Sequence, residues 1–89
     1  MKSITVTLVN QLGLHARAAS KLVQTASSFD AEIWVSFQGR RVNAKSIMGV
    51  LLLAAPCGSQ LLIEAEGHQA DQALDAIRGL IDGRFGETT

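Results

Sequence analysis

Apolar and polar residues alternate in four stretches of the chain, which is the pattern of β-strands with one buried face. The stretches are residues 3–9, EIWVSF at 32–37, RRVN at 40–43 and LLIEAE at 61–66. The pair Gln38-Gly39 separates the second stretch from the third and predicts a two-residue hairpin turn. The residues expected to face inward are Ile4, Val6, Leu8, Ile33, Val35, Phe37, Leu61, Ile63 and Ala65.

Three other segments place apolar residues at helical spacing. The first begins at Ala16 and is expected to end near Ser27–Ser28. The second, Ile47–Ala55, is apolar on all sides and is followed by Pro56 and Gly58. The third ends at Gly83, a predicted C-cap, and residues 86–89 are expected to form a frayed tail. The apolar stripes are Ala19, Leu22, Val23 and Ala26 in the first helix and Ala70, Ala73, Leu74, Ile77, Leu80 and Ile81 in the third.

The elements therefore follow the order strand, helix, strand, strand, helix, strand, helix. This order predicts an α+β fold in which three helices cover one face of a four-stranded, mainly antiparallel sheet. The 89 residues are expected to form one domain, 1–89. A chain of this length buries roughly two-thirds of its unfolded surface, which is enough for one modest core.

Composition excludes several classes of function. Eight basic and eight acidic residues cancel without forming a basic cluster, which argues against binding to nucleic acid or to an anionic membrane. The longest apolar run, Ile47–Cys57, is too short to span a bilayer, and the first residues alternate instead of forming a signal peptide. Cys57 is the only cysteine, as is typical of a reducing compartment. We expect a cytoplasmic monomer whose partners are proteins or small molecules.

His15 lies where the first loop gives way to the first helix, within GLHARAAS at 13–20. The first N–H groups of a helix have no intrahelical partner, and the helix dipole adds partial positive charge beside them. This field favours an anion, so a neutral imidazole that gained a phosphoryl group here would place it well. The backbone N–H groups of Ala16 and Arg17, with the Arg17 guanidinium, would hold that group.

The alternative interpretation is that His15 is an exposed helix-capping residue without any chemistry. Gly13 slightly favours the chemical role, because glycine lets the loop turn tightly beside the site. His15, His68 and Cys57 do not have the spacing of metal ligands, and no second acid or base accompanies His15. We therefore expect no metal, no cofactor and no independent enzymatic activity.

The segment after Ser46 is unusual because a short helix in a small domain can turn only one side to the core. Val50, Leu53 and Ala54 form one stripe, and Ile47, Met48 and Leu51 form another. One set is expected to be exposed as a docking surface, unless the helix is irregular and mostly buried. Ser46 is either a helix cap, worth about 1 kcal/mol, or a phosphorylation site beside that surface.

GLHAR at 13–17 and VNAKSIMGVLLLAA at 42–55 together resemble the HPr family, the histidine-containing phosphocarriers of the bacterial phosphotransferase system, with its NPr branch. The resemblance covers nearly the whole chain and implies an open-faced β-sandwich with the order βαββαβα. It implies that His15 accepts a phosphoryl group at Nδ1 from enzyme I, which phosphoenolpyruvate charges, and passes it to enzyme IIA domains. Arg17 would support that phosphoryl group.

The same resemblance implies a regulatory site and a partner surface. Ser46 looks like the residue that HPr kinase/phosphorylase modifies in bacteria that have this enzyme. The residues that would contact partners are Ser20, Lys21, Gln24, Ile47, Met48 and Leu51.

Ala18 departs from the family pattern, because many members have proline at this position. Alanine keeps the course of the helix, so we expect little loss of phosphoryl acceptance. In this respect the sequence is similar to members of the nitrogen-related branch and to some proteobacterial carriers. Two outputs are thus consistent with the sequence: sugar uptake, or regulation by a binding protein whose phosphorylation state gates a kinase, a transporter or a transcription factor.

Overall fold

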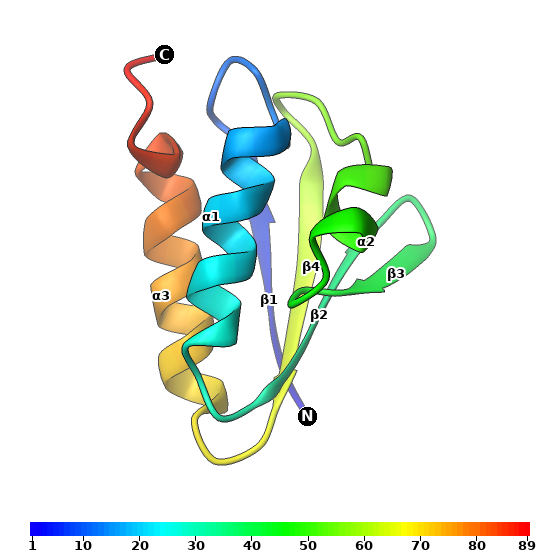
Figure 1. Ribbon diagram of the computed structural model, residues 1–89, viewed down its shortest axis with the longest axis vertical. Helices are drawn as coiled ribbons and strands as arrows, with labels where there is room; N and C mark the ends of the chain where they lie inside the picture. Colours follow the sequence, from blue (N-terminus) through cyan, green and yellow to red (C-terminus); the bar gives the residue numbers. More distant parts are fainter.

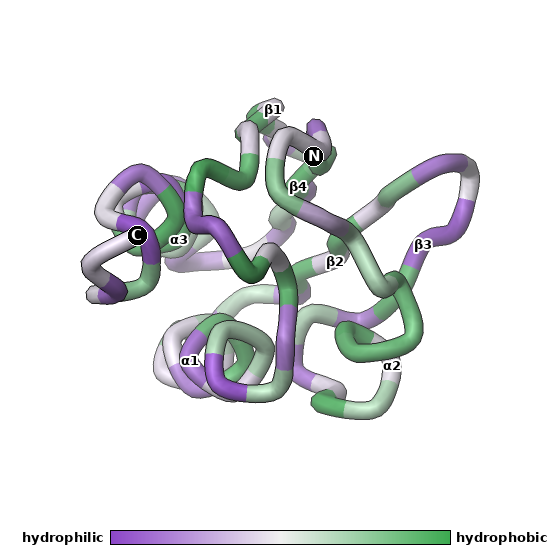
Figure 2. Tube along the Cα trace, turned by 90° about the horizontal axis from the view of Figure 1, so that it is seen from above, coloured by the Kyte–Doolittle hydropathy of each residue, from purple (hydrophilic) through white to green (hydrophobic).

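Four antiparallel strands and three α-helices make up the computed structural model, which describes residues 1–89 (Figure 1). The strands are β1 (Lys2–Thr7), β2 (Glu32–Phe37), β3 (Arg40–Asn43) and β4 (Gln60–Glu66), in the sheet order β1-β4-β2-β3. The helices are α1 (Ala16–Ser27), α2 (Ile47–Leu52) and α3 (Ala70–Asp82). All three helices lie on the same side of the sheet, as the view from above in Figure 2 shows. The predicted α+β, open-faced architecture is confirmed. None of these helices combines the length and the apolar character that crossing a bilayer requires.

Strand β4 is central to the sheet, although it is the last strand in the chain. Its Ile63 lies opposite Ile4 of β1 on one side and opposite Val35 of β2 on the other. Alternation then turns Leu61, Ile63 and Ala65 to the helices, and all three are fully buried, as predicted.

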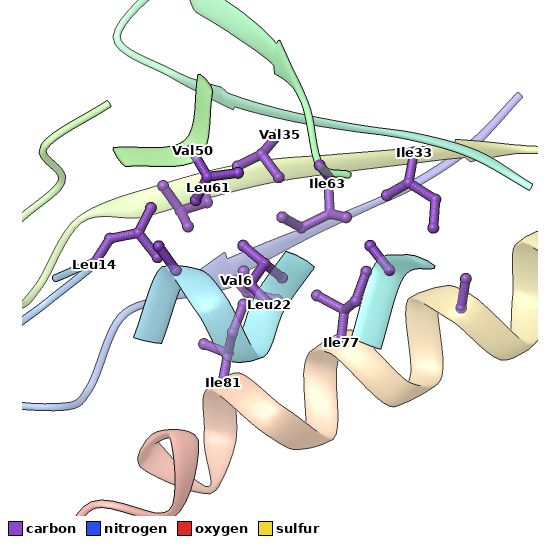
Figure 3. Packing of buried hydrophobic residues seen from close by; sticks show 14 of the residues in the cluster. Val6, Leu14, Leu22, Ile33, Val35, Val50, Leu61, Ile63, Ile77 and Ile81 are labelled. Carbon is purple, nitrogen blue, oxygen red and sulfur yellow. The ribbon is translucent and has the colours of Figure 1, made fainter. Parts of the chain in front are cut away.

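The core fills the space between the sheet and the helices (Figure 3). Four of its side chains are at most 5% exposed: Ile63 and Val6 of the sheet, Leu22 of α1 and Ile77 of α3. Burying one such side chain contributes roughly 1.5–3 kcal/mol, so these contacts hold α1 and α3 against the strands. The orientation of α1 is thereby determined, and with it the position of its first residue.

Helix α2 is shorter than the sequence predicts, because it ends at Leu52 instead of Ala55. Ala54 adopts a left-handed backbone conformation (φ +49°) and is exposed, so its predicted place in the buried stripe is wrong. Pro56 disfavours helical backbone at Ala55. The carbonyl oxygen of Ala55 instead accepts a 2.9 Å hydrogen bond from the N–H of Leu14. Val50 and Leu53 are buried, as predicted.

The C-terminal residues are not frayed, so that prediction is wrong. Gly83 is the C-cap of α3, as predicted, and a 3₁₀ turn follows whose three residues, Arg84, Phe85 and Gly86, all have positive φ. Phe85 is completely buried. Hydrogen bonds continue beyond it, since the N–H of Gln11 donates to the carbonyl oxygen of Thr89 over 2.9 Å. Figure 1 shows the tail at the same end of the molecule as the start of α1.

Candidate functional site

His15 is the N-cap residue of α1, with an extended backbone (φ −79°, ψ −177°). Its carbonyl oxygen accepts the first helical hydrogen bond, from the N–H of Ala19 at 2.8 Å. Its side chain makes no capping hydrogen bond, so its place at the N-cap rests on the backbone alone. The N–H groups of Ala16, Arg17 and Ala18 therefore have no partner within the helix and no side-chain cap.

Gly13 determines how the loop approaches the helix. Its φ is +65°, and a Cβ atom there would lie only 2.5 Å from the carbonyl oxygen of Ala55. Any other residue would force this loop away from the segment between α2 and β4. Glycine is thus required at position 13 for a structural reason, since it permits the close approach to Ala55 that positions His15.

Glu87 of the C-terminal tail contacts the imidazole of His15, and sequence reasoning missed it. Its Oε2 lies 2.5 Å from Nε2 of His15, while its Oε1 accepts a 3.1 Å hydrogen bond from Nδ2 of Asn10. Asn10 is fully buried and its Nδ2 also donates to the carbonyl oxygen of Gly13, at 2.7 Å. The side chains of His15 and Glu87 are only 28% and 13% exposed, so the pair is partly shielded from water.

The hydrogen bond to His15 lowers the pKa of Glu87 below its usual value, and the hydrogen bond from Asn10 and the charge of Lys21 act in the same direction. Partial burial opposes this change without reversing it. Near neutral pH Glu87 is therefore an ionised carboxylate, which can only accept hydrogen bonds. It follows that Nε2 of His15 donates, and that the other ring nitrogen, Nδ1, carries the lone pair when the imidazole is neutral.

Arg17 follows His15 in the first turn of α1, and its side chain is exposed and in no ion pair. A depression of about 690 Å³ brings it together with His15, with Leu12 and with the tail residues Gly86–Thr89. The guanidinium is therefore free to contact an anion that enters this depression, and its role in holding a phosphoryl group stays a prediction.

Known proteins that are similar to this chain identify its family. The family model for the PTS HPr component phosphorylation site matches residues 2–82. The phosphocarrier protein HPr of Cupriavidus necator is 51% identical over 81 residues, which cover 91% of each chain. The phosphocarrier protein NPr of Shewanella violacea is 45% identical over 84 residues, covering 94% of this chain and 92% of the other. A crystal structure of HPr from Thermoanaerobacter tengcongensis superimposes with a TM-score of 0.96 at 44% identity, covering both chains completely.

The chain belongs to the HPr family. Its members are phosphocarriers of the phosphotransferase system, where they act together with enzyme I and enzyme II. The proline that is common in the family would fall on Ala18, which is fully buried in the first turn of α1. The N–H of Ala18 has no partner within the helix, so alanine leaves one more backbone donor at the site than proline would.

In this HPr family member the residues predicted to contact partners lie on α1 and α2, which pack against each other. On α2, Ile47 and Met48 are 40% and 65% exposed, and Leu52, which the sequence analysis did not single out, is 62% exposed. Leu51 is partly buried against the core, so its predicted exposure is only partial. An exposed apolar cluster of this kind is typical of a surface that binds proteins.

The predicted residues of α1 are all partly or fully accessible. Gln24 donates to Oγ of Ser20 over 3.4 Å, and both side chains reach solvent. Lys21 also anchors the C-terminal tail, because its Nζ donates a hydrogen bond to the carbonyl oxygen of Phe85 at 2.5 Å.

Ser46 is the N-cap of α2, as predicted, and its Oγ accepts a 3.2 Å hydrogen bond from the N–H of Gly49. The residue is exposed and directly precedes the apolar cluster of Ile47 and Met48. Both interpretations of Ser46 are thus compatible with the structure, since a phosphorylated cap can also accept backbone hydrogen bonds.

Glu87 should make the stability of the protein depend on pH in a defined direction. A carboxyl whose pKa is lowered on folding stabilises the native state above its ordinary pKa, 4.5, and ceases to do so as the pH falls through the lowered value. Urea denaturation should therefore show wild type more stable than Glu87→Gln near neutral pH, with a gap that narrows below pH 4.5. The matched variant Glu66→Gln, exposed on β4, should show no such narrowing. A gap that widens in acid would contradict this assignment.

Proposed function

We propose that this chain is a phosphocarrier in which His15 accepts a phosphoryl group at Nδ1 from phosphorylated enzyme I and passes it to enzyme IIA domains. The main support for the proposal is that one of the two ring nitrogens of the imidazole is free. Glu87 occupies Nε2 and Nδ1 makes no hydrogen bond within the protein, so one nucleophilic nitrogen is available at an uncapped helix N-terminus.

Each transfer is a substitution at phosphorus. The lone pair of Nδ1 forms a bond to the phosphorus atom, and the bond between phosphorus and the donor breaks with its electron pair remaining on the donor. In the second step an acceptor attacks the same phosphorus atom, and the electron pair of the N–P bond returns to Nδ1. The chain is thereby restored unchanged and can accept the next phosphoryl group.

Arg17 and the backbone of α1 supply the positive field for the phosphoryl oxygens. The guanidinium is exposed and unpaired, and the N–H groups of Ala16 and Arg17 have no helical partner. Charge-assisted hydrogen bonds from such donors are roughly twice as strong as neutral ones. They stabilise the dianion on His15 without a metal or a cofactor.

The surface proposed for partner recognition is formed by α1 and α2. It consists of Ser20, Lys21, Gln24, Ile47, Met48 and Leu51, and we include the exposed Leu52 in it. Docking enzyme I or an enzyme IIA domain there would bury the apolar side chains of α2 and bring the partner's reacting group to the N-terminus of α1. The polar residues of α1 would form the rim of the contact.

We further propose that phosphorylation of Ser46, by an HPr kinase/phosphorylase where one is present, regulates this docking. Its exposed hydroxyl group lies next to Ile47 and Met48 in the chain, at the edge of the apolar surface. A phosphate there adds about two negative charges. Burying those charges against a partner is costly, so transfer would slow while the fold is retained.

Mixing the protein with enzyme I and phosphoenolpyruvate should add one acid-labile phosphoryl group. His15→Ala should abolish the labelling, because it removes the nucleophile. The matched control is His68→Ala, because His68 is the only other histidine and is exposed at a position distant in sequence. The His68→Ala variant should be labelled like wild type. Intact-mass spectrometry measures the addition. Labelling of His15→Ala at the wild-type level would refute the proposal.

Ser46→Asp should slow phosphoryl transfer from enzyme I at least several-fold, because it places a charge at the docking surface. Aspartate is itself a good N-cap, so thermal unfolding should change little. Ser46→Ala loses the cap and about 1 kcal/mol of stability, yet it should transfer at nearly the wild-type rate. Rapid-quench kinetics compares the three proteins. Equal rates for Ser46→Asp and wild type would show that this surface tolerates the charge.

A further inference from the structure

We infer that Glu87 is a positioning residue for phosphoryl transfer, which keeps the proton on Nε2 of His15 so that Nδ1 is always the nitrogen that gains and loses the phosphoryl group. The inference rests on the proposed carrier function and extends it to a residue outside GLHAR and outside the matched residues 2–82. The contact that supports it is the one between Oε2 of Glu87 and Nε2 of His15, at 2.5 Å.

The carboxylate is held in place from two sides. Asn10 is buried and its Nδ2 donates both to Oε1 of Glu87 and to the carbonyl oxygen of Gly13, so the amide orientation is determined by two acceptors. The tail that carries Glu87 is anchored by the buried ring of Phe85 and by Lys21, whose Nζ donates to the Phe85 carbonyl oxygen. Glu87 is therefore preorganised, although it lies in a terminal segment.

The chemistry requires a proton at Nε2 throughout the cycle. A neutral imidazole protonated at Nε2 has its lone pair on Nδ1, and attack on phosphorus leaves a positively charged ring that still carries the Nε2 proton. Glu87 lies against that proton and stabilises the positive ring. When the N–P bond breaks, the electron pair returns to Nδ1 and the ring is neutral again, so no proton has to move in either direction. An orienting carboxylate of this kind determines the tautomer of its histidine.

Glutamine at position 87 tests this role because it keeps the shape of the side chain and removes one acceptor. Glu87 uses both oxygens, one for Asn10 and one for His15. Glutamine has a single oxygen, and Nδ2 of Asn10 can only donate to it. The amide nitrogen would then face Nε2 of His15 and donate to it, which favours the tautomer with the proton on Nδ1. That tautomer has no lone pair on the reacting nitrogen.

The first measurement needs no partner protein. Long-range ¹H–¹⁵N correlation spectra of the ring nitrogens, recorded where the imidazole is neutral, report which nitrogen carries the proton. In wild type we expect the Nε2–H tautomer of His15 to dominate, and in Glu87→Gln we expect a shift towards Nδ1–H. Glu66→Gln, the matched control, should give the wild-type spectrum. Unchanged backbone amide shifts on the sheet and α3 will show that Glu87→Gln folds normally.

The second measurement is the rate of transfer from phosphorylated enzyme I. At metal sites, loss of the carboxylate that orients a ligating histidine costs roughly 10- to 100-fold, and we expect Glu87→Gln to be slower by about the same factor while Glu66→Gln is not. Equal tautomer populations in wild type and Glu87→Gln would overturn the inference, and so would faster transfer by the variant, which would mean that the tail obstructs the site. If wild type takes no phosphoryl group, the carrier function fails, and the spectra alone still decide whether Glu87 sets the tautomer.

Discussion

The position of His15 depends on backbone hydrogen bonds that join the β1–α1 loop to the segment between α2 and β4. The N–H of Leu8 donates to Ser59, the N–H of Gly58 donates to Leu8, and the N–H of Leu14 donates to Ala55, each within 2.9 Å. Gly13 permits this approach, because a Cβ atom there would overlap the Ala55 carbonyl. The segment that follows α2 thus contacts the loop that precedes α1 and holds it in position.

A second constraint comes from the C-terminus. The turn after α3 is unfavourable for Arg84 and Phe85, since residues with side chains seldom adopt positive φ. Complete burial of the Phe85 ring and the hydrogen bond from Lys21 offset this cost. The result is a tail that reaches the N-terminus of α1 from another part of the chain and places a carboxylate against the imidazole. The site is therefore assembled from three segments that are distant in sequence.

The strands and helices could be predicted because each has a clear local period, and the buried face of β4 shows this well. The sheet order could not, since alternation gives the buried face of β4 without telling which strands flank it. The end of α2 was predicted three residues too late, because Leu53, Ala54 and Ala55 have ordinary helical propensity and the hydrogen bond from Leu14 to Ala55 is a long-range contact. The end of α3, by contrast, could be predicted from the local signal of Gly83.

The residues of the candidate site, too, could be predicted from the sequence only in part. His15, Arg17 and Ser46 could be found because they lie in short motifs at helix starts, where the chemistry is local. Glu87 and Asn10 could not, since 77 residues separate them and nothing in the polar tail indicates a partner. One signal was present: Phe85 is a large apolar residue after the predicted C-cap, and such a residue in an otherwise polar tail suggests anchoring.

The linkage of the phosphoryl group to Nδ1 of His15 can be measured directly. The uniformly ¹⁵N-labelled protein is phosphorylated with enzyme I and phosphoenolpyruvate, and the ring nitrogen shifts and their coupling to phosphorus are recorded. We expect Nδ1 of His15 to bear the phosphorus atom while Nε2 keeps its proton. A phosphoryl group on Nε2, or on any residue other than His15, would contradict this expectation.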